Sequence, residues 1–178
     1  DFMCVGSVDS YIGRQNKGGP NSRHHQQLLL GPWLHGRFKE INKVGELTYP
    51  EHAKFPEAHM IRWFDHYLKG VENGVEKEST VRYYTMGAVG ENSAPGNEWR
   101  TSKDWPIKAN TKSYYFQEGG SLNGSKPSVA NSRTTFLADP LNPASIPERA
   151  FPGGKDARPF EAQKEVKTFS SEVLANPV

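Results

Sequence analysis

The run Leu28–Leu30, followed by Gly31 and Pro32, constrains the fold of this chain more than any other feature. Three consecutive leucines are too few for a buried helix and are typical of a core strand in a parallel sheet. Gly31 and Pro32 end that strand abruptly, and His35 follows it within five residues. Catalytic groups in open α/β sheets lie beyond the carboxyl ends of the strands. His35 is therefore a candidate general base; the alternative is a loop histidine that caps a carbonyl.

The segment 1–75 alternates predicted strands and helices. We expect strands over Phe2–Val5 and Gln27–Leu30, a loop or short helix over Ser10–Gly19, and a helix from Pro56 to Leu68. The apolar residues of that helix fall on one face, at Met60, Ile61, Phe64, Tyr67 and Leu68. Gly70 is its expected end. The pattern predicts a βαβ-like fragment whose helix covers a parallel sheet.

The segment 76–178 loses the helical period and consists of short β-branched and aromatic runs separated by turn residues. This pattern favours an all-β sandwich or jelly roll. The predicted strands are Val81–Met86, Glu98–Thr101, Ser113–Phe116 and Val166–Phe169. We therefore predict an α/β domain over 1–75 and a β-sandwich over 76–178, either of which can be incomplete. Both ends are abrupt, so we expect a segment of a longer protein.

Composition narrows the range of partners. The net charge is +2, and no basic block is interleaved with aromatics, so we expect no nucleic-acid partner. No apolar run reaches the ~20 residues of a membrane helix, so no membrane partner is expected. The single cysteine, Cys4, cannot form an internal disulfide and is predicted to be a buried thiol. The sequence leaves open whether the chain forms a homo-oligomer, and it does not indicate the localisation.

A catalytic imidazole needs a carboxylate on its far nitrogen. Asp9 follows the predicted strand Phe2–Val5, and two successive parallel strands would place it at the same sheet edge as His35. The alternative for Asp9 is a helix N-cap or a turn. Trp33 is a candidate to line the substrate pocket, or else it packs in the core.

The nucleophile is missing from this sequence. No Gly-x-Ser-x-Gly elbow occurs; Ser121 has the context of a hairpin turn, and Ser7 is too close to Asp9. A triad that runs Ser, Asp, His along the chain would have its first member upstream. No His-Glu-x-x-His motif, Cys/His cluster or glycine-rich phosphate loop is found, so we expect neither a metal nor a cofactor.

Five segments resemble, in order, motifs of the cocaine-esterase-like and X-Pro dipeptidyl-peptidase-like serine hydrolases. The first is Leu30–Gly36, similar to the "GPW-x-H" segment of that family, and the second is Trp63–Gly70, similar to its "W-F-D-x-x-L-K-G" helix. The others are Val81–Gly87 (followed by Trp99 and Trp105-Pro106), Asp139–Pro143 and Thr168–Leu174. The resemblance implies an α/β-hydrolase domain followed by a jelly roll.

The same resemblance implies that His35 is the triad base and Asp9 the acid, with the serine and the oxyanion hole upstream. The expected reaction is hydrolysis of an ester, amide or X-Pro peptide bond in a small-molecule or peptide substrate. This segment alone would then be inactive. A different class of function stays open: a non-catalytic jelly-roll binding or interaction module with a vestigial hydrolase segment.

Overall fold

The computed structural model describes residues 2–34, 42–91, 93–129, 131–145 and 153–175. The chain divides into two compact units. The first unit is Asp1–Ile107 with Pro152–Gly154, and the second is Lys108–Phe151 with Lys155–Val178. No described helix is long and apolar enough to cross a membrane.

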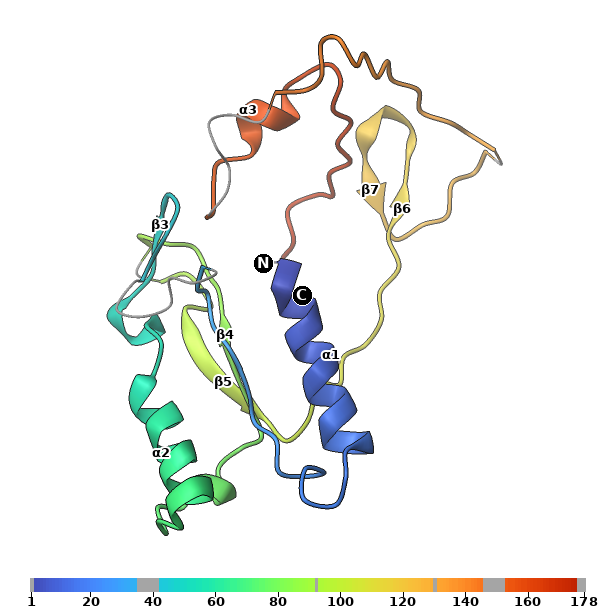
Figure 1. Cartoon of the computed structure of the whole chain (residues 1–178). Coiled ribbons are helices and arrows are strands. Elements are labelled where there is room, and N and C mark those ends of the chain that lie inside the picture. Colours follow the sequence, from blue (N-terminus) through green and yellow to red (C-terminus); the bar gives the residue numbers. More distant parts are fainter. Residues whose placement is uncertain (1, 35–41, 92, 130, 146–152, 176–178) are drawn as a thin grey trace. The chain divides into compact units, whose positions relative to one another are not determined.

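The first unit begins with helix α1, Phe2–Lys17, and not with a strand (Figure 1). The expected strand Phe2–Val5 is wrong because its residues belong to a longer helical pattern. Val8, Tyr11 and Ile12 have the spacing of one helix face, and all three pack in the core. Cys4 is exposed, so the predicted buried thiol is also wrong.

Strand β1, Leu28–Leu30, pairs in parallel with β4, Val81–Thr85, and Leu29 lies opposite Arg82. Helix α2, Glu57–Lys69, lies between these two strands in the sequence. A parallel βαβ connection is therefore present, but its second strand is β4, from the predicted β-sandwich segment, and the expected strand Phe2–Val5 takes no part in it. Strand β5, Glu98–Ser102, adds to β4 in the antiparallel direction and gives the sheet order β1-β4-β5.

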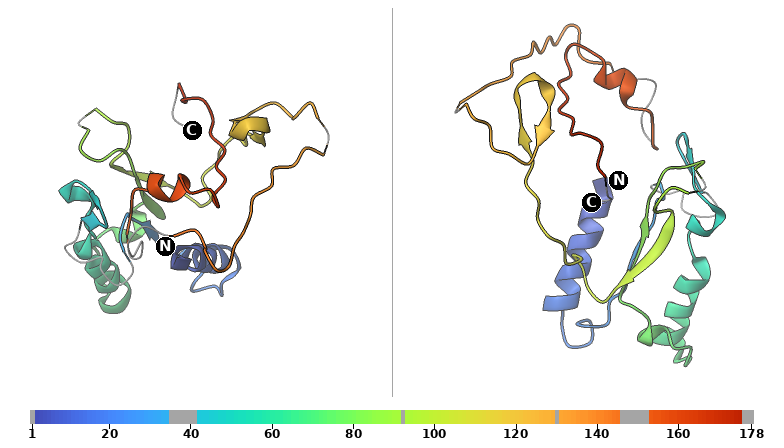
Figure 2. Two further views of the ribbon diagram at one scale, coloured as in Figure 1. Left: turned by 90° about the horizontal axis from the view of Figure 1, so that it is seen from above. Right: turned by 180° about the vertical axis from the view of Figure 1, so that it is seen from behind.

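The two helices lie on opposite sides of this sheet (Figures 1 and 2). On the α1 side, Tyr11 packs with Leu28 and Val81. On the other side, Tyr84 of β4 packs with Tyr49 and Ala53. Because successive strand residues point to opposite faces, Val81 and Tyr84 belong to different cores. The supporting elements are the β2–β3 hairpin, Lys43–Val44 with Leu47–Thr48, and the short helices η1, Glu51–Ala53, and η2, Val75–Lys77.

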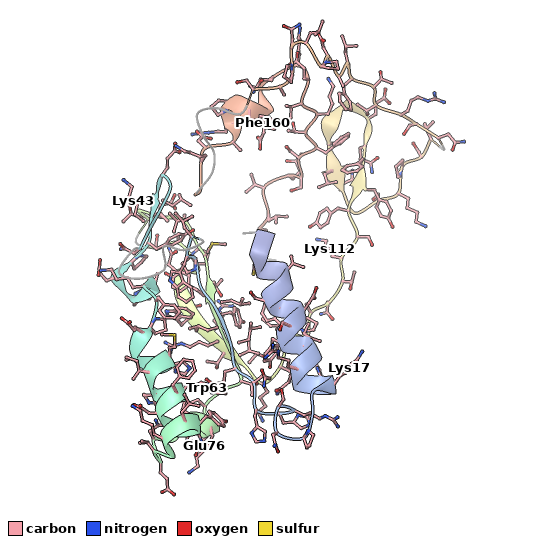
Figure 3. All side chains as sticks on the ribbon, in the orientation of Figure 1. Lys17, Lys43, Trp63, Glu76, Lys112 and Phe160 are labelled. Atoms are coloured by element: carbon pink, nitrogen blue, oxygen red, sulfur yellow. The ribbon has the colours of Figure 1, made fainter. Side chains whose placement is uncertain are left out.

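Helix α2 presents an unexpected face to the rest of the unit. Of its predicted apolar stripe, Ile61, Phe64 and Leu68 are 52%, 50% and 76% exposed. The side chains that contact acidic residues of the following segment are His59, Arg62 and His66. Figure 3 labels Trp63 on α2 and Glu76 on η2. The helix ends as predicted at Gly70, which adopts the left-handed conformation.

The boundary between the compact units falls near residue 107, whereas the sequence placed a domain boundary near 75. The cause is the pairing of β4 and β5 with β1, which joins two predicted β-domain strands to the α/β sheet. The mixed sheets and few helices of the described chain fit a partial α/β fold with a β-rich part. The jelly-roll arrangement stays a prediction.

The second unit contains little regular structure among its described residues. Strands β6, Tyr115–Phe116, and β7, Leu122–Asn123, form a small hairpin around η3, Glu118–Gly120. Helix α3 spans Arg158–Glu161. The expected strand Val166–Phe169 is wrong: the segment is coil, and the adjacent Ser170 forms an isolated bridge with Ser121.

Candidate functional site

The segment after β1 is held by a close approach between Gly31 and Trp33. A Cβ atom on Gly31 would overlap the indole ring of Trp33, so only glycine leaves the ring its place. The indole Nε1–H of Trp33 donates to the carbonyl of Ala53 at 2.7 Å. The "GPW" sequence therefore fixes the chain that leaves the carboxyl end of β1.

Trp33 packs inside the first unit. Its ring lies 5.0 Å from Phe55 and 5.8 Å from Trp99, measured between ring centroids. Since its one hydrogen-bond donor is used by Ala53, the indole can offer a ligand only apolar surface. The substrate-lining role of Trp33 stays a prediction.

His35 lies outside the described residues, which stop at Leu34 and resume at residue 42. Its position in the sequence still relates it to the fold. In the sequence it follows the carboxyl end of β1, which pairs in parallel with β4. The carboxyl ends of parallel strands form the sheet edge where α/β proteins bind ligands.

Asp9 is exposed in the middle of α1 and does not follow a strand. It comes one residue after Val8, so it points about 100° around the helix from a core-facing side chain. Helix α1 and strand β1 run in opposite directions, which places the start of α1 at the edge where β1 ends (Figure 1). Asp9 lies seven residues into α1 from Phe2, or roughly 10 Å along the helix axis from that start. Asp9 was predicted as the triad acid because it was expected to follow a strand, and the structure removes that reason.

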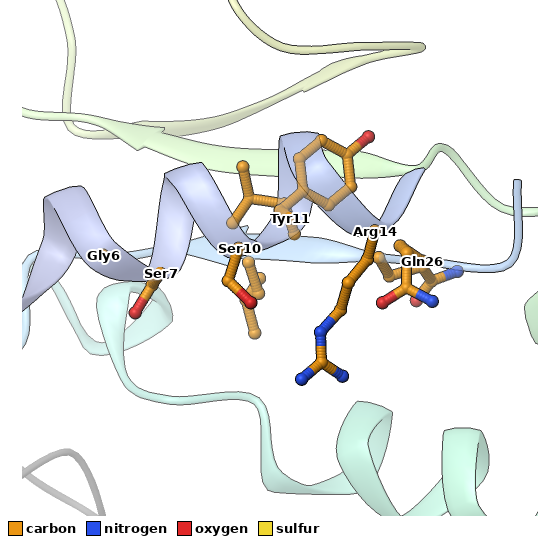
Figure 4. Close-up of a pocket in the computed structure, with 9 residues that line it drawn as sticks. Gly6, Ser7, Ser10, Tyr11, Arg14 and Gln26 are labelled. Carbon is orange, nitrogen blue, oxygen red and sulfur yellow. The ribbon is translucent and has the colours of Figure 1, made fainter. Parts of the chain in front are cut away.

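A groove of about 850 Å³ lies between α1 and β1 (Figure 4). Ser7, Ser10 and Arg14 of α1 line one side, and Gln26 and Gln27 contribute from the other. No histidine or carboxylate is among its lining residues. The groove thus lacks the general base that would activate either serine hydroxyl.

A polar cluster that the sequence did not predict lies between α2 and the segment before β4. His59 Nε2 contacts Gln27 Oε1 at 2.9 Å, and His59 Nδ1 lies 3.3 Å from Glu78 Oε2. The other oxygen of Glu78 binds Arg62 Nη1 at 2.7 Å. Burial lowers the pKa of His59; Glu78 opposes this effect, and Arg82 and Arg62 add to it. The signal in the sequence that could have found this cluster is the spacing of His59, Arg62 and His66, which puts three polar side chains on one face of α2.

Within the part of the chain that the structure covers, no group of three or more His, Cys, Asp or Glu side chains could hold a metal ion.

Comparison with known proteins gives similarities to esterases. The chain is 27% identical to the cocaine esterase of a Rhodococcus species over 200 aligned positions that cover 99% of this chain. It is 28% identical over 112 residues, 63% of the chain, to proteins named "putative serine esterase" in Mycobacterium bovis and Mycobacterium tuberculosis. No family model matches the chain.

The chain spans only part of these relatives: 33% of the cocaine esterase and 16% of each mycobacterial protein. The similarity to the cocaine esterase runs over nearly the whole chain. Together these weak similarities support a relationship to the cocaine-esterase-like serine hydrolases, as the motif order predicted.

Proposed function

We propose that the protein containing this chain is a serine hydrolase that cleaves ester or amide bonds through a Ser–His–Asp triad. This chain contributes the histidine, His35, and an aspartate, and the serine lies in another part of the protein. The observation that carries the proposal is the similarity to proteins named as esterases over nearly the whole chain. The βαβ unit adds support, because His35 follows a parallel strand at its carboxyl end.

In the proposed mechanism, His35 accepts the proton of the serine hydroxyl as the serine attacks the substrate carbonyl. The same imidazole then gives that proton to the leaving group, and water completes a second half-reaction. The carboxylate fixes the imidazole tautomer and stabilises the imidazolium. The proposed substrates are small-molecule esters and amides or X-Pro peptides.

The first test is His35→Ala in the complete protein, assayed with a chromogenic ester. We expect kcat/KM to fall by at least about a thousandfold, as for a lost triad base. His25→Ala is the matched control, because His25 is exposed and precedes β1. A folded His35→Ala protein with near wild-type turnover would contradict the proposal and favour a non-catalytic binding module.

Asp9, predicted from the sequence, is the candidate for the triad acid. Replacing the true acid by asparagine is expected to lower kcat about 10⁴-fold, because asparagine stabilises the wrong imidazole tautomer. Asp9→Asn in the complete protein, assayed with the same ester, tests the role. A mild effect would place the acid elsewhere.

A further inference from the structure

A cavity of about 520 Å³ lies on the α2 side of the sheet. Its floor includes one row of cross-strand neighbours, Leu29 of β1, Arg82 of β4 and Thr101 of β5. The walls include His59 of α2 and the segment Lys77–Ser79. The register therefore puts a half-buried arginine on the central strand, on the α2 side of the sheet.

Arg82 has no carboxylate partner among the described residues. Its guanidinium carbon lies 4.9 Å from the centre of the Trp99 ring, a cation–π contact that uses none of its N–H donors. The nearest acid of the cavity lining, Glu78, is already engaged on both oxygens, by Arg62 and by His59. Arg82 is half-buried, and its N–H donors are therefore open to an oxyanion that enters the cavity.

Further hydrogen-bond donors line the same cavity. The hydroxyls of Thr101 and Ser79, both on exposed residues, line it. Lys77 also lines the cavity and lies 3.7 Å from Glu76. The cationic side chains of the lining therefore outnumber its one acid, Glu78, which is itself paired.

We propose that this cavity binds a small oxyanion, a carboxylate or a phosphate, with the guanidinium of Arg82 as its main ligand. The fork of N–H donors holds two anion oxygens, and the Thr101 hydroxyl, which lies opposite Arg82 on the neighbouring strand, donates a further hydrogen bond. The site stands apart from the proposed hydrolase function, because none of its lining residues belongs to the proposed triad.

The test is isothermal titration of the full chain with inorganic phosphate and, separately, with acetate. We expect one saturable site for at least one of the two anions. Saturation by acetate alone identifies a carboxylate ligand, and saturation by phosphate alone identifies a phosphate. Arg82→Gln is expected to weaken binding at least tenfold. Arg82→Lys is expected to weaken it less, since a lysine keeps the charge but not the planar fork.

The matched control is Arg100→Gln on the neighbouring strand. Arg100 lies opposite Tyr83, so it is on the other sheet face, and it pairs with Glu98. Its replacement is expected to leave anion affinity unchanged. Thr101→Val tests the site without removing a charge and is expected to weaken binding several-fold. Unfolding midpoints of all variants establish that the sheet is intact.

The proposal is overturned if the wild-type chain binds neither anion. It is equally overturned if folded Arg82→Gln and Thr101→Val bind as tightly as wild type, or if Arg100→Gln weakens binding as much as Arg82→Gln does. The last result would mean that general surface charge, and not this cavity, attracts the anion.

Discussion

At the scale of single residues, His59 links the stability of the fold to pH. Burial lowers its pKa in the folded chain, with Arg82 and Arg62 acting in the same direction and Glu78 opposing them. The unfolded chain therefore takes up a proton near the usual value of about 6.5, before the folded chain does. The stability held by the neutral imidazole is present above that pH and is lost as the pH falls through the folded-state pKa.

We predict that the free energy of unfolding of the wild-type chain falls more steeply between pH 7 and pH 5 than that of His59→Gln. Glutamine keeps a polar group beside Gln27 but cannot titrate. Urea unfolding at a series of pH values measures both slopes. His25→Gln, at an exposed position, should retain the wild-type slope. Equal slopes for wild type and His59→Gln would contradict the prediction.

Gly31 gives a second prediction at this scale. Gly31→Ala is expected to lower the free energy of unfolding by about 1–3 kcal/mol, because the added methyl must displace the indole of Trp33. Urea unfolding measures the loss, and tryptophan fluorescence reports the displaced ring. Gly19→Ala is the control, since a Cβ atom there would meet nothing within 4 Å. A wild-type midpoint for Gly31→Ala would show that the contact is not tight.

At the scale of elements, α1 shows why a local pattern misleads. Four apolar residues at the start of the chain look like a strand, yet the packed face of the helix comes later, at Val8, Tyr11 and Ile12. Only the longer window contains the helical period. Helix α2 shows the reverse case: its existence and its end at Gly70 were predictable, but its packing face was not.

The helical state of residues 2–17 is testable through Gly13. A Cβ atom on Gly13 would meet nothing within 4 Å, and in a helix alanine is favoured over glycine by about 0.5–1 kcal/mol. We therefore expect Gly13→Ala to raise the free energy of unfolding by about that amount. Gly6→Ala, in the same helix, should act in the same direction. If both substitutions destabilise the chain, the helix assignment fails.

At the scale of the whole molecule, the two compact units differ in regular structure. The first contains the three-stranded sheet, whereas described residues 131–145 of the second belong to no helix or strand. Several apolar side chains of the second unit are largely exposed, among them Leu137 at 78%, Leu141 at 90% and Val173 at 98%. These side chains therefore add little to a core of the second unit.

We predict that this difference appears in amide hydrogen exchange. Peptides covering β4 and β5 should stay protected after peptides covering residues 131–145 have exchanged fully, because sheet hydrogen bonds open only with larger unfolding events. Mass spectrometry of the full chain measures both sets in one experiment. Equal protection of the two regions would mean that the second unit has a core beyond the described contacts.

The sequence by itself determined what local signals encode: the strand Leu28–Leu30 and the helix that ends at Gly70. It also located His35 beyond a strand end. The tertiary structure decided which faces are buried. It gave α2 an inward face of His59, Arg62 and His66, and it brought β4 and β5 to the first sheet. The physical reason is that packing partners come from distant parts of the chain, and no local period records them.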